Sequence, residues 1–531
     1  MRYFNKTKTI MLFAVVAVSL GVVSCRKDFL DINNNPNAVT TSSITPELIF
    51  PGSALNSAGI QAGGAYTFLN NWMGYTGASG DFVPDLIETK YDIDFGFANG
   101  IWNGHYETLF DLFQVKKMAL AKGDSVLAGA SMILSDKLWQ ELVDLYGNIP
   151  YTDAFHLERT STPTYDRDSS IYRMLQGDLD QAISYMGGTA AGTYANTVAA
   201  VIHFGGTPTG GTSSGASQAN WIRFANTLKL RLLLHSSEVA TPNVNRAAEL
   251  AKIIANGGVL QAGQSVSVNP GYLNSAGKQS PYYANFGYGA TGIDASTIVR
   301  ANKYTVDSLN ARADQRLARF YRGAGATTPT SLGGAIVGVT YGAVSNPTGV
   351  NSSKVGFGTA NNAGQDQWLL TSVESLFLQA EAIQRGWLPG SGAAAYQAAV
   401  NESFTWLGVP TPTVAAAALT APSNPLVNYA SASTNPTVNG NPFSAIKLIA
   451  YQKYVALNQL NPQESYADLR RLRMIPDNGY ISVNSSRLAN NLPNRLPYPQ
   501  AEYTLNFANV SAQGVVDKTT IFTTAKIFWQ P

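Results

Sequence analysis

The 531-residue chain has one cysteine, Cys25, and only four histidines. A single thiol allows no intrachain disulfide, so the folded state has to be stabilised by packing. The histidines form no HExxH motif and no pair at metal-ligand spacing, so we predict no metal site and no cofactor. Catalysis through a zinc ion or a histidine-based triad therefore has little to build on.

Charge is also scarce. Lys, Arg, Asp and Glu make up 13% of the chain, against about 25% in average soluble domains, and the formal net charge is +2. Binding to nucleic acid requires a basic face, and no cluster of Lys or Arg supplies one. We therefore expect no nucleic-acid partner.

One long apolar run is present, from Ile10 to Val23, and it is too short to span a bilayer as a mature helix. Arg2, Lys6 and Lys8 precede it, and this order of basic and apolar residues predicts a signal peptide over residues 1–24. No comparable run follows, so we expect no other membrane span.

Cys25 directly follows Val22-Val23-Ser24, where a signal peptide would be cut. This arrangement resembles a bacterial lipoprotein box, which implies that Cys25 becomes the first mature residue and carries acyl chains that anchor it to a membrane. The alternative is a free structural thiol. Residues 25–45 are polar and rich in Asn, which predicts a lipidated tether. The folded body is expected over residues 46–531.

Apolar residues recur at spacings of three, four and seven in most regular segments, which predicts amphipathic helices in consecutive pairs. Long Gly-, Thr- and Ser-rich segments separate them, and loops of this length tend to be functional. We predict a mostly α-helical scaffold of stacked helix pairs with long loops packed on it. The strongest helices are expected over 131–146, 221–240 and 372–387, and weaker ones over 46–75, 97–122, 169–185, 245–256, 306–321, 392–407 and 443–458.

Six motifs stand out along the chain: DLYGNIPYTDAF (144–155), PTYDRDSSIYRMLQGDLDQAI (163–183), WIRFANTLKLRLLLHSSE (221–238), DQRLARFY (314–321), ESLFLQAEAIQRGW (374–387) and NRLPYPQAEYTLN (494–506). They resemble the SusD/RagB family of nutrient-binding outer-membrane lipoproteins, and they occur in that family's order. The resemblance implies a tetratricopeptide-like helical fold, anchorage in the outer membrane, and a partner transporter of the SusC type that depends on TonB. It also implies capture of glycans or, in some branches, of peptides.

Most of these motif residues have a structural interpretation. Trp221 and Phe224 lie on the apolar stripe of their helix and are predicted to be core anchors. Glu374, Glu381 and Arg385 are predicted to be charges on a helix face, with Glu381 four residues before Arg385.

The sequence does not support an enzymatic function. GTSSG, residues 211–215, formally matches the nucleophile motif G-x-S-x-G at Ser213, but a nucleophile elbow needs a buried strand before it and a helix after it. Here we expect Gly/Thr/Ser-rich loop on both sides. A hydrolase through Ser213 is accordingly the weakest of the hypotheses.

Aromatic residues outside the helical stripes favour a binding site. A sugar presents flat C–H patches flanked by hydroxyls, so its site needs an aromatic face with amides or carboxylates at the rim. Two segments, 71–106 and 275–292, combine these groups. The alternative for each aromatic is burial in the core, which we expect of Phe97, Trp102 and Tyr106. The candidate ligand-binding residues are Trp72, Tyr75, Phe82, Tyr282, Tyr283, Phe286 and Tyr288.

The resulting hypothesis is a cell-surface lipoprotein that binds an oligosaccharide and delivers it to a SusC-like TonB-dependent transporter, with no reaction catalysed. A peptide-binding protein on the same scaffold is the first alternative, and it would show an apolar groove with backbone partners. A purely structural helical adaptor is the second, and it would bury the loop aromatics. Exposure of Tyr282, Tyr283 and Phe286 on one open face with Trp72 or Tyr75 would favour glycan binding over the adaptor.

Overall fold

The structure is a computed structural model that describes residues 44–188, 198, 201–206, 213–215 and 217–531. The chain divides into two units, residues 1–45 and 46–531, and the second unit is described below. Cys25 and the predicted signal peptide lie outside the described residues. Among the helices that are described, none has the length and apolar character needed to cross a bilayer.

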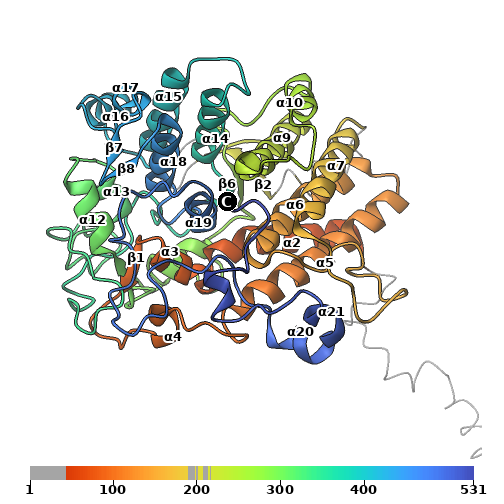
Figure 1. Ribbon diagram of the computed structural model, residues 1–531, viewed down its shortest axis with the longest axis horizontal. Helices are drawn as coiled ribbons and strands as arrows, with labels where there is room; N and C mark the ends of the chain where they lie inside the picture. The colour runs from red at the N-terminus through yellow and green to blue at the C-terminus, as the bar shows by residue number, and fades with distance from the viewer. Residues whose placement is uncertain (1–43, 189–197, 199–200, 207–212, 216) are drawn as a thin grey trace, which may run out of the picture. The chain divides into compact units, whose positions relative to one another are not determined.

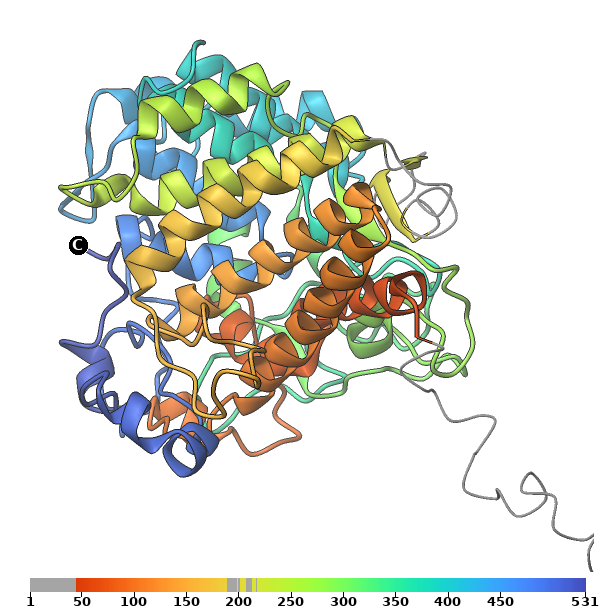
Figure 2. The same ribbon diagram turned by 90° about the vertical axis from the view of Figure 1, so that its right-hand side faces the viewer.

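Long helices stacked in pairs form the frame of the body (Figures 1 and 2). Helices adjacent in sequence pack against each other, as in α5 with α6 and α14 with α15, and each pair also contacts the next. This confirms the predicted scaffold of helix pairs. The long helices are α2 (Pro46–Ala62), α5 (Asn99–Ala121), α6 (Ser125–Tyr146), α7 (Asp168–Met186), α9 (Gln218–His235), α10 (Arg246–Ala255), α14 (Ser372–Gln384), α15 (Gly392–Trp406), α18 (Ala445–Ala456) and α19 (Pro462–Leu472).

Short helices occupy segments that periodicity does not mark. α11 lies where an irregular loop is predicted, and α16 and α17 lie in a segment predicted to be irregular, so these expectations are wrong. The predicted helix over 306–321 is two helices, α12 and α13, separated by a turn at Ala313 with φ 51°. The short helices are α3 (Thr67–Trp72), α4 (Leu86–Lys90), α11 (Pro281–Phe286), α12 (Lys303–Asn310), α13 (Leu317–Phe320), α16 (Pro412–Thr420), α17 (Tyr429–Ser433), α20 (Gln500–Leu505) and α21 (Phe507–Ser511), with 3-10 turns η2 (Gly64–Tyr66), η3 (Ser236–Glu238) and η4 (Thr520–Phe522).

Side-chain caps explain where the long helices begin. The side chain of Asp124 accepts a hydrogen bond from the Leu127 backbone amide at 2.9 Å and starts α6. Thr371 does the same for α14, and Asn461 for α19. Each cap satisfies one backbone N–H that has no partner within the helix, which is worth about 1 kcal/mol.

Small antiparallel sheets join segments that are distant in the sequence. A four-stranded sheet in the order β3-β2-β4-β6 contacts α2 through β4 and β6. A two-stranded ribbon pairs β1 with β5, with Gly77 opposite Arg300. The sheets were not predicted, because each strand is too short to show a period of two. The strands are β1 (Thr76–Ala78), β2 (Ile202–Gly205), β3 (Ser213–Gly215), β4 (Val266–Val268), β5 (Val299–Ala301), β6 (Gln367–Leu370), β7 (Thr437–Val438) and β8 (Asn441–Pro442).

One large apolar core runs through the body, from α2 to the C-terminal segment. Trp221 and Phe224 are fully buried in it, which confirms their predicted role as anchors. Trp102 is also buried, as expected, while Phe97 and Tyr106 are partly buried at its edge. Both large aromatic side chains of the family motif on α9 are therefore inaccessible to a ligand.

Candidate functional site

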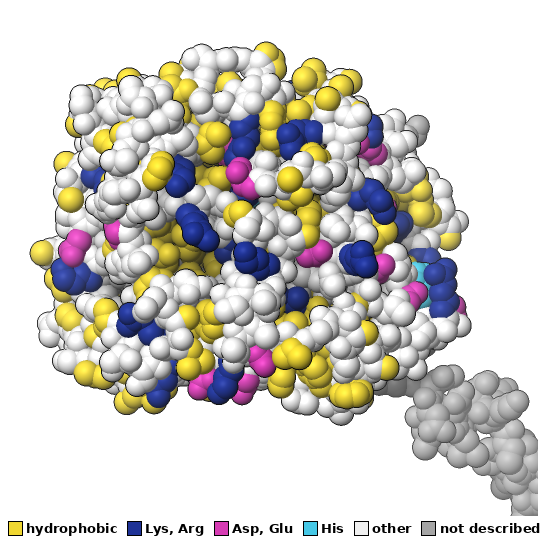
Figure 3. Space-filling view, in the orientation of Figure 1, with side chains coloured by type: hydrophobic (Ala, Val, Ile, Leu, Met, Phe, Trp, Pro, Cys, Tyr) yellow, Lys and Arg dark blue, Asp and Glu magenta, His cyan; other side chains and the backbone are white. Residues whose placement is uncertain are grey.

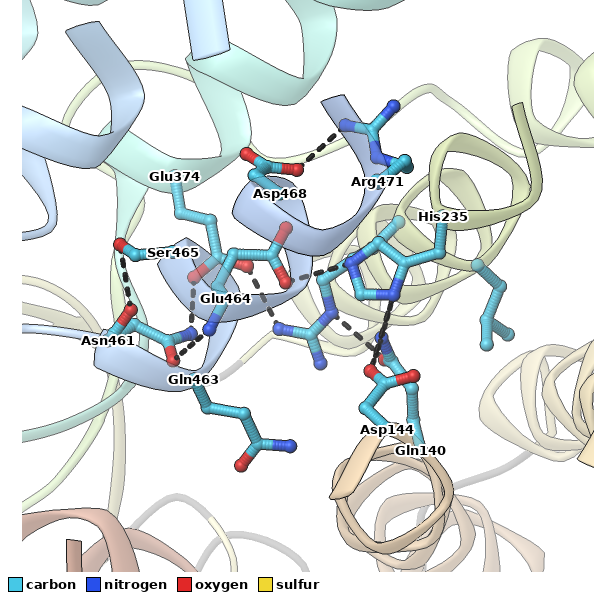
Figure 4. Close-up of polar contacts among 12 residues, drawn as sticks. Gln140, Asp144, His235, Glu374, Asn461, Gln463, Glu464, Ser465, Asp468 and Arg471 are labelled. Atoms are coloured by element: carbon cyan, nitrogen blue, oxygen red, sulfur yellow. Dashed lines mark hydrogen bonds and ion pairs between the residues drawn. The ribbon is translucent and has the colours of Figure 1, made fainter. Parts of the chain in front are cut away.

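Two groups of residues carry enough polar chemistry to be considered as a site. The first is a network of charged side chains buried between α6, α9, α14, α18 and α19 (Figure 4). His235 stands at its centre, with Nδ1 3.2 Å from a carboxylate oxygen of Asp144 and Nε2 3.0 Å from one of Glu464. Lys453 extends the network from Glu464 to Asp468, and Arg471 joins Asp468 at 2.7 Å.

Mutual pairing keeps these groups ionised away from water. Burial alone would lower the pKa of His235, but the carboxylates of Glu464 and Asp144 raise it to about 9. Burial likewise opposes ionisation of Glu381, yet the Arg471 guanidinium lowers the pKa of that carboxyl to about 2. Arg231 donates to Glu374 at 2.9 Å and to Gln140.

This network also corrects the interpretation of the family motifs. Glu374 and Glu381 are each 1% exposed, so they are not charges on a solvated helix face. Glu381 does contact Arg385 at 2.8 Å across one helical turn, as predicted, but it also binds Arg471 of α19. The motifs therefore hold helices together, and we assign the network to the fold because its groups are paired with one another and shielded from solvent.

The second group is a cluster of loops around the β1–β5 ribbon, made of residues 79–91, 287–300 and 323–354, which we call the loop cluster. Its segments meet through backbone hydrogen bonds, from Ser79 N to Ile298 O at 2.9 Å and from Gly80 N to Pro347 O at 2.8 Å. Figure 1 shows these segments gathered beside α4 and α12, away from the α5–α7 helices. Loops positioned on a rigid scaffold are where binding residues commonly lie.

Two glycines permit the close crossing of these loops. A Cβ atom at Gly80 would lie 1.9 Å from the backbone carbonyl oxygen of Asn346. A Cβ atom at Gly349 would lie 2.9 Å from both Asp81 and the Thr297 carbonyl oxygen. Any other residue would push the segments apart, so the shape of the loop cluster depends on both positions.

A cavity of about 180 Å³ opens on one side of the turn at residues 79–83. Its charged wall is Asp294, which contacts Arg300 at 3.0 Å and Lys354 at 2.6 Å. Burial lowers the pKa of the Lys354 ammonium to about 8, although Asp294 opposes the shift. Lys354 Nζ also lies 3.6 Å from the ring centroid of Tyr288. Sequence reasoning missed these three charges, because they are spread over sixty positions and no local spacing connects them.

A second cavity of about 180 Å³ is lined by residues that flank the same turn in the sequence, among them Ala78 and Pro84. Asn71, Glu88 and Asn346 line it, so amides and a carboxylate face the space. Asn71 donates a hydrogen bond to Glu88 at 2.9 Å. Burial raises the pKa of Glu88 to about 7, while that hydrogen bond opposes the shift. The cavity thus offers both donors and acceptors for hydroxyl groups.

The turn also presents apolar side chains to solvent. Phe82 is 41% exposed, and it is the one candidate aromatic that the structure leaves accessible. Other positions of the loop cluster expose aliphatic side chains. They are Val83, Leu86, Ile87, Ile293, Ile298, Leu332, Val344 and Val350.

The structure does not bring the other predicted aromatics onto an open face. Trp72 and Tyr75 are fully buried. Trp72 stacks against Phe97 and meets Tyr466 edge-on, and the Tyr75 hydroxyl donates to the Tyr454 carbonyl oxygen at 2.6 Å. Both side chains therefore pack the end of α3 against α18 and α19, where a ligand cannot stack on them.

The second aromatic group is likewise interior, because Pro281–Phe286 forms helix α11 rather than a loop. Tyr282 donates to Gln459 at 2.9 Å and contacts Trp368, and Phe286 packs on Tyr282. Tyr283 is 6% exposed, and Tyr288 lies behind the first cavity with its hydroxyl bonded to the Ala326 carbonyl oxygen. The expected open aromatic face is absent among these residues.

The remaining sequence candidates do not form a catalytic site. Ser213 begins strand β3, so no described strand leads into it as a nucleophile elbow requires. Across the described residues, no group of three or more His, Cys, Asp or Glu side chains is placed to hold a metal ion. Cys25 lies outside those residues, and lipidation there stays a prediction.

Comparison with known proteins agrees with this architecture. The SusD-like family, described as starch-binding and associating with the outer membrane, matches residues 40–499. No match is found among the curated proteins. Similar solved structures include a SusD/RagB family protein from Bacteroides thetaiotaomicron, with 17% identity, a TM-score of 0.69, and coverage of 92% of this chain and 99% of that one.

Two further structures have the same fold. A chitin-binding SusD homologue from Flavobacterium johnsoniae is 21% identical with a TM-score of 0.67, and the match covers 90% of this chain and 98% of that one. A SusD homologue from Bacteroides vulgatus is 20% identical with a TM-score of 0.65, over 91% and 99%. The chain therefore belongs to the SusD-like family.

Proposed function

We propose that this protein is a lipid-anchored outer-membrane protein at the cell surface that binds an oligosaccharide at the loop cluster and delivers it to a SusC-like TonB-dependent transporter. The family description, which names starch binding and association with the outer membrane, supports the class of ligand and the location. A structural relative is described as chitin-binding, which also fits a glycan ligand.

The observation that carries the proposal is the surface around Phe82. This ring is exposed on a turn held by Asp81, whose carboxylate accepts a hydrogen bond from the Gly349 amide at 2.6 Å. One cavity is lined by Asp81 of the turn and the other by residues that flank the turn, and both have amides or charged groups in their walls. An apolar ring flanked by such groups matches a sugar, which has C–H faces and hydroxyl edges.

The proposal does not include catalysis. In the loop cluster the four carboxyl groups are engaged: Asp294 with Arg300 and Lys354, Asp81 with Gly349, Asp85 with the first turn of α4, and Glu88 with Asn71. A glycosidase requires one protonated and one ionised carboxyl group at a defined separation across the substrate. Carboxylates held in this way serve to shape the surface.

Peptide binding is a second candidate, and one observation favours it. Most exposed apolar side chains of the loop cluster are aliphatic, such as Val83, Ile87 and Ile298, and these suit peptide side chains as well as sugars. The burial of six of the seven predicted aromatics is also what a structural adaptor would show. The exposed turn, its two cavities and the family match are the reasons for placing a ligand there.

A binding screen tests the proposal. The folded body, residues 46–531, would be run in affinity electrophoresis against starch, chitin and plant glycans, and against a panel of unstructured peptides. Retardation by one glycan class, confirmed by calorimetry, is the expected result. Binding of peptides and of no glycan would favour the second candidate, a peptide-binding protein. Failure to bind either panel by a protein with intact circular dichroism would contradict both.

A further inference from the structure

A cavity larger than the two at the loop cluster lies elsewhere, between the ends of α18 and α19, the β7–β8 hairpin and the C-terminal segment. Its volume is about 840 Å³, within the range of about 300–1,000 Å³ that is usual for small-molecule sites. Figure 3 shows the surface hollowed near α18 and α19, with several Lys and Arg side chains around the hollow. Asn494 is the one residue of the family motifs that lines this cavity, and the loop cluster contributes none.

The wall of this cavity, which we call the basic cavity, is strongly unbalanced in charge. Lys447, Arg470, Arg473 and Lys526 line it, and Asp477 is the one carboxylate side chain among the lining residues. Four cationic side chains against one acidic side chain leave an excess of three positive side-chain charges, whereas the side chains of the entire chain sum to a formal net charge of +2. Concave surfaces lined by one sign of charge concentrate the field and attract the opposite charge.

These cations are not paired with acidic side chains. In the part of the chain that the structure describes, no Asp or Glu carboxylate lies within 4.0 Å of any of the four. Lys447 donates to the Pro442 carbonyl oxygen at 3.0 Å, and Lys526 donates at 2.7 Å to a main-chain oxygen of Pro531, the last residue of the sequence. This contrasts with Lys354 and Arg471, which are paired with carboxylates.

Arg470 supplies a buried charge to the same wall. It is 9% exposed, and its Nη1 atom donates to the carbonyl oxygens of Asp144 and Asn494, both at 2.8 Å. Its Nη2 atom has no hydrogen-bond partner in the structure. Its guanidinium also lies 3.9 Å from the ring centroid of Tyr466. A buried guanidinium held by neutral groups remains available to attract an anion.

The rest of the lining suits a polyhydroxylated molecule. Five asparagines contribute amides that can both donate and accept hydrogen bonds, as hydroxyl groups require. A site for phosphate or nucleic acid would require the cationic side chains, but it would not require so many amide side chains. The asparagines are Asn441, Asn478, Asn490, Asn491 and Asn494.

We propose that the basic cavity is a second ligand site and that it binds an anionic saccharide, one bearing a carboxylate or sulfate group. The anion is recognised by Arg473, Lys447 and Lys526 at the accessible wall, over the buried charge of Arg470. The amides bind the hydroxyl groups. That the anion is carried on a sugar rests on the proposed function, but the preference for an anion does not.

Calorimetry on the purified full chain tests this proposal with three ligands: an oligogalacturonide, the neutral galactose oligomer of equal length, and sodium sulfate. The variant is R473Q/K526Q, which removes two exposed charges and leaves Arg470 in place. K278Q is the control, because Lys278 is an exposed lysine outside the cavity. Phe82→Ala reports on the loop cluster separately.

The expected result is binding of the oligogalacturonide over the neutral oligomer, roughly tenfold weaker in R473Q/K526Q and unchanged in K278Q and Phe82→Ala. Equal affinity for acidic and neutral oligomers would overturn the proposal, as would loss of uronide binding in Phe82→Ala alone. Binding of sulfate without the uronide would overturn the saccharide part. A further outcome separates the two sites. If the uronide binds but no neutral glycan binds at the loop cluster, the proposed role of Phe82 is overturned while the basic cavity remains supported.

Discussion

The Nε2 atom of His235 lies 3.0 Å from a carboxylate oxygen of Glu464, and both side chains are almost completely buried. The pair links α9 to α19, which are far apart in the sequence. Asp144 of α6 contacts the other ring nitrogen of His235, so the imidazolium is held between two carboxylates. The protonated side chain of His235 on α9 therefore links α6 and α19 to α9 through two ion pairs.

This pair predicts a loss of stability at alkaline pH. The pKa of His235 is about 9 in the folded protein, against an ordinary value of 6.5 for histidine. Between these values the folded protein holds a proton that the unfolded chain has lost, so raising the pH favours unfolding. The contribution is fully present below pH 6.5 and is lost as pH passes 9, and it amounts to about 3 kcal/mol.

Urea denaturation at pH 6, 7.5 and 9 measures this effect. The wild-type free energy of unfolding should fall more steeply over the range than that of His235→Gln, which cannot take up the proton. The difference between the two proteins cancels the contribution of other groups, such as Lys354. Parallel profiles for the two proteins would show that His235 is neutral in the folded state.

Removal of one partner from a buried ion pair is expected to be costly. Arg471 binds both oxygens of Glu381, at 2.6 and 2.8 Å, and Arg471→Met would leave that carboxylate buried without this partner. We expect a loss of about 3–5 kcal/mol in the free energy of unfolding. Lys122→Met breaks the exposed contact with Glu47 and should cost less than about 1 kcal/mol. Equal costs for the two variants would contradict the assignment of the network to the fold.

The crossing of the loops at Gly80 should be sensitive to one methyl group. In Gly80→Ala the new Cβ atom would clash with the Asn346 carbonyl oxygen and separate the segments of the loop cluster. We expect a stability cost of about 1–3 kcal/mol and a loss of ligand affinity at the loop cluster. Gly177→Ala in α7 is the control, because nothing lies within 4 Å of its Cβ position. That change should stabilise the protein by about 0.5–1 kcal/mol and leave binding unchanged.

Tyr282 is expected to affect folding rather than binding. Tyr282→Ala removes a buried ring that contacts Trp368 and Phe286, so unfolding should become easier by about 3–5 kcal/mol. Tyr282→Phe loses only the hydrogen bond to Gln459 and should cost about 1 kcal/mol. Thermal denaturation checks both values. A fully stable Tyr282→Ala protein with weakened ligand binding would restore Tyr282 as a ligand contact.

The helical scaffold was predictable because the period of a helix is visible within a short stretch of sequence. Apolar residues such as Phe224 and Leu228 repeat along one face of α9. α19 was not predicted, since nearly all of its residues are buried, charged ones included. In the sequence, charged residues such as Glu464, Asp468 and Arg471 are typical of an exposed surface. They are buried here because they pair with charged residues of other helices, which the sequence of α19 alone does not show.

The candidate site was predictable only in part. Phe82 was identified from its setting in a segment that mixes aromatics with Asn, Asp and Gly, and it is exposed. The same signal pointed to Tyr282 and Tyr288, which helix α11 and the cations Lys354 and Arg322 draw into the interior. An aromatic in an irregular segment looks the same whether the fold covers it or not, because exposure depends on contacts between distant segments.

The most direct test of a glycan-binding loop cluster compares two phenylalanines of equal exposure. Phe82 is 41% exposed in the loop cluster and Phe110 is 43% exposed on α5. Calorimetric titration of the best glycan from the screen should show affinity falling by about tenfold or more in Phe82→Ala and unchanged in Phe110→Ala, since aromatic stacking accounts for a large share of sugar binding. Equal affinity of both variants and the wild type would contradict the assignment of the ligand to the loop cluster.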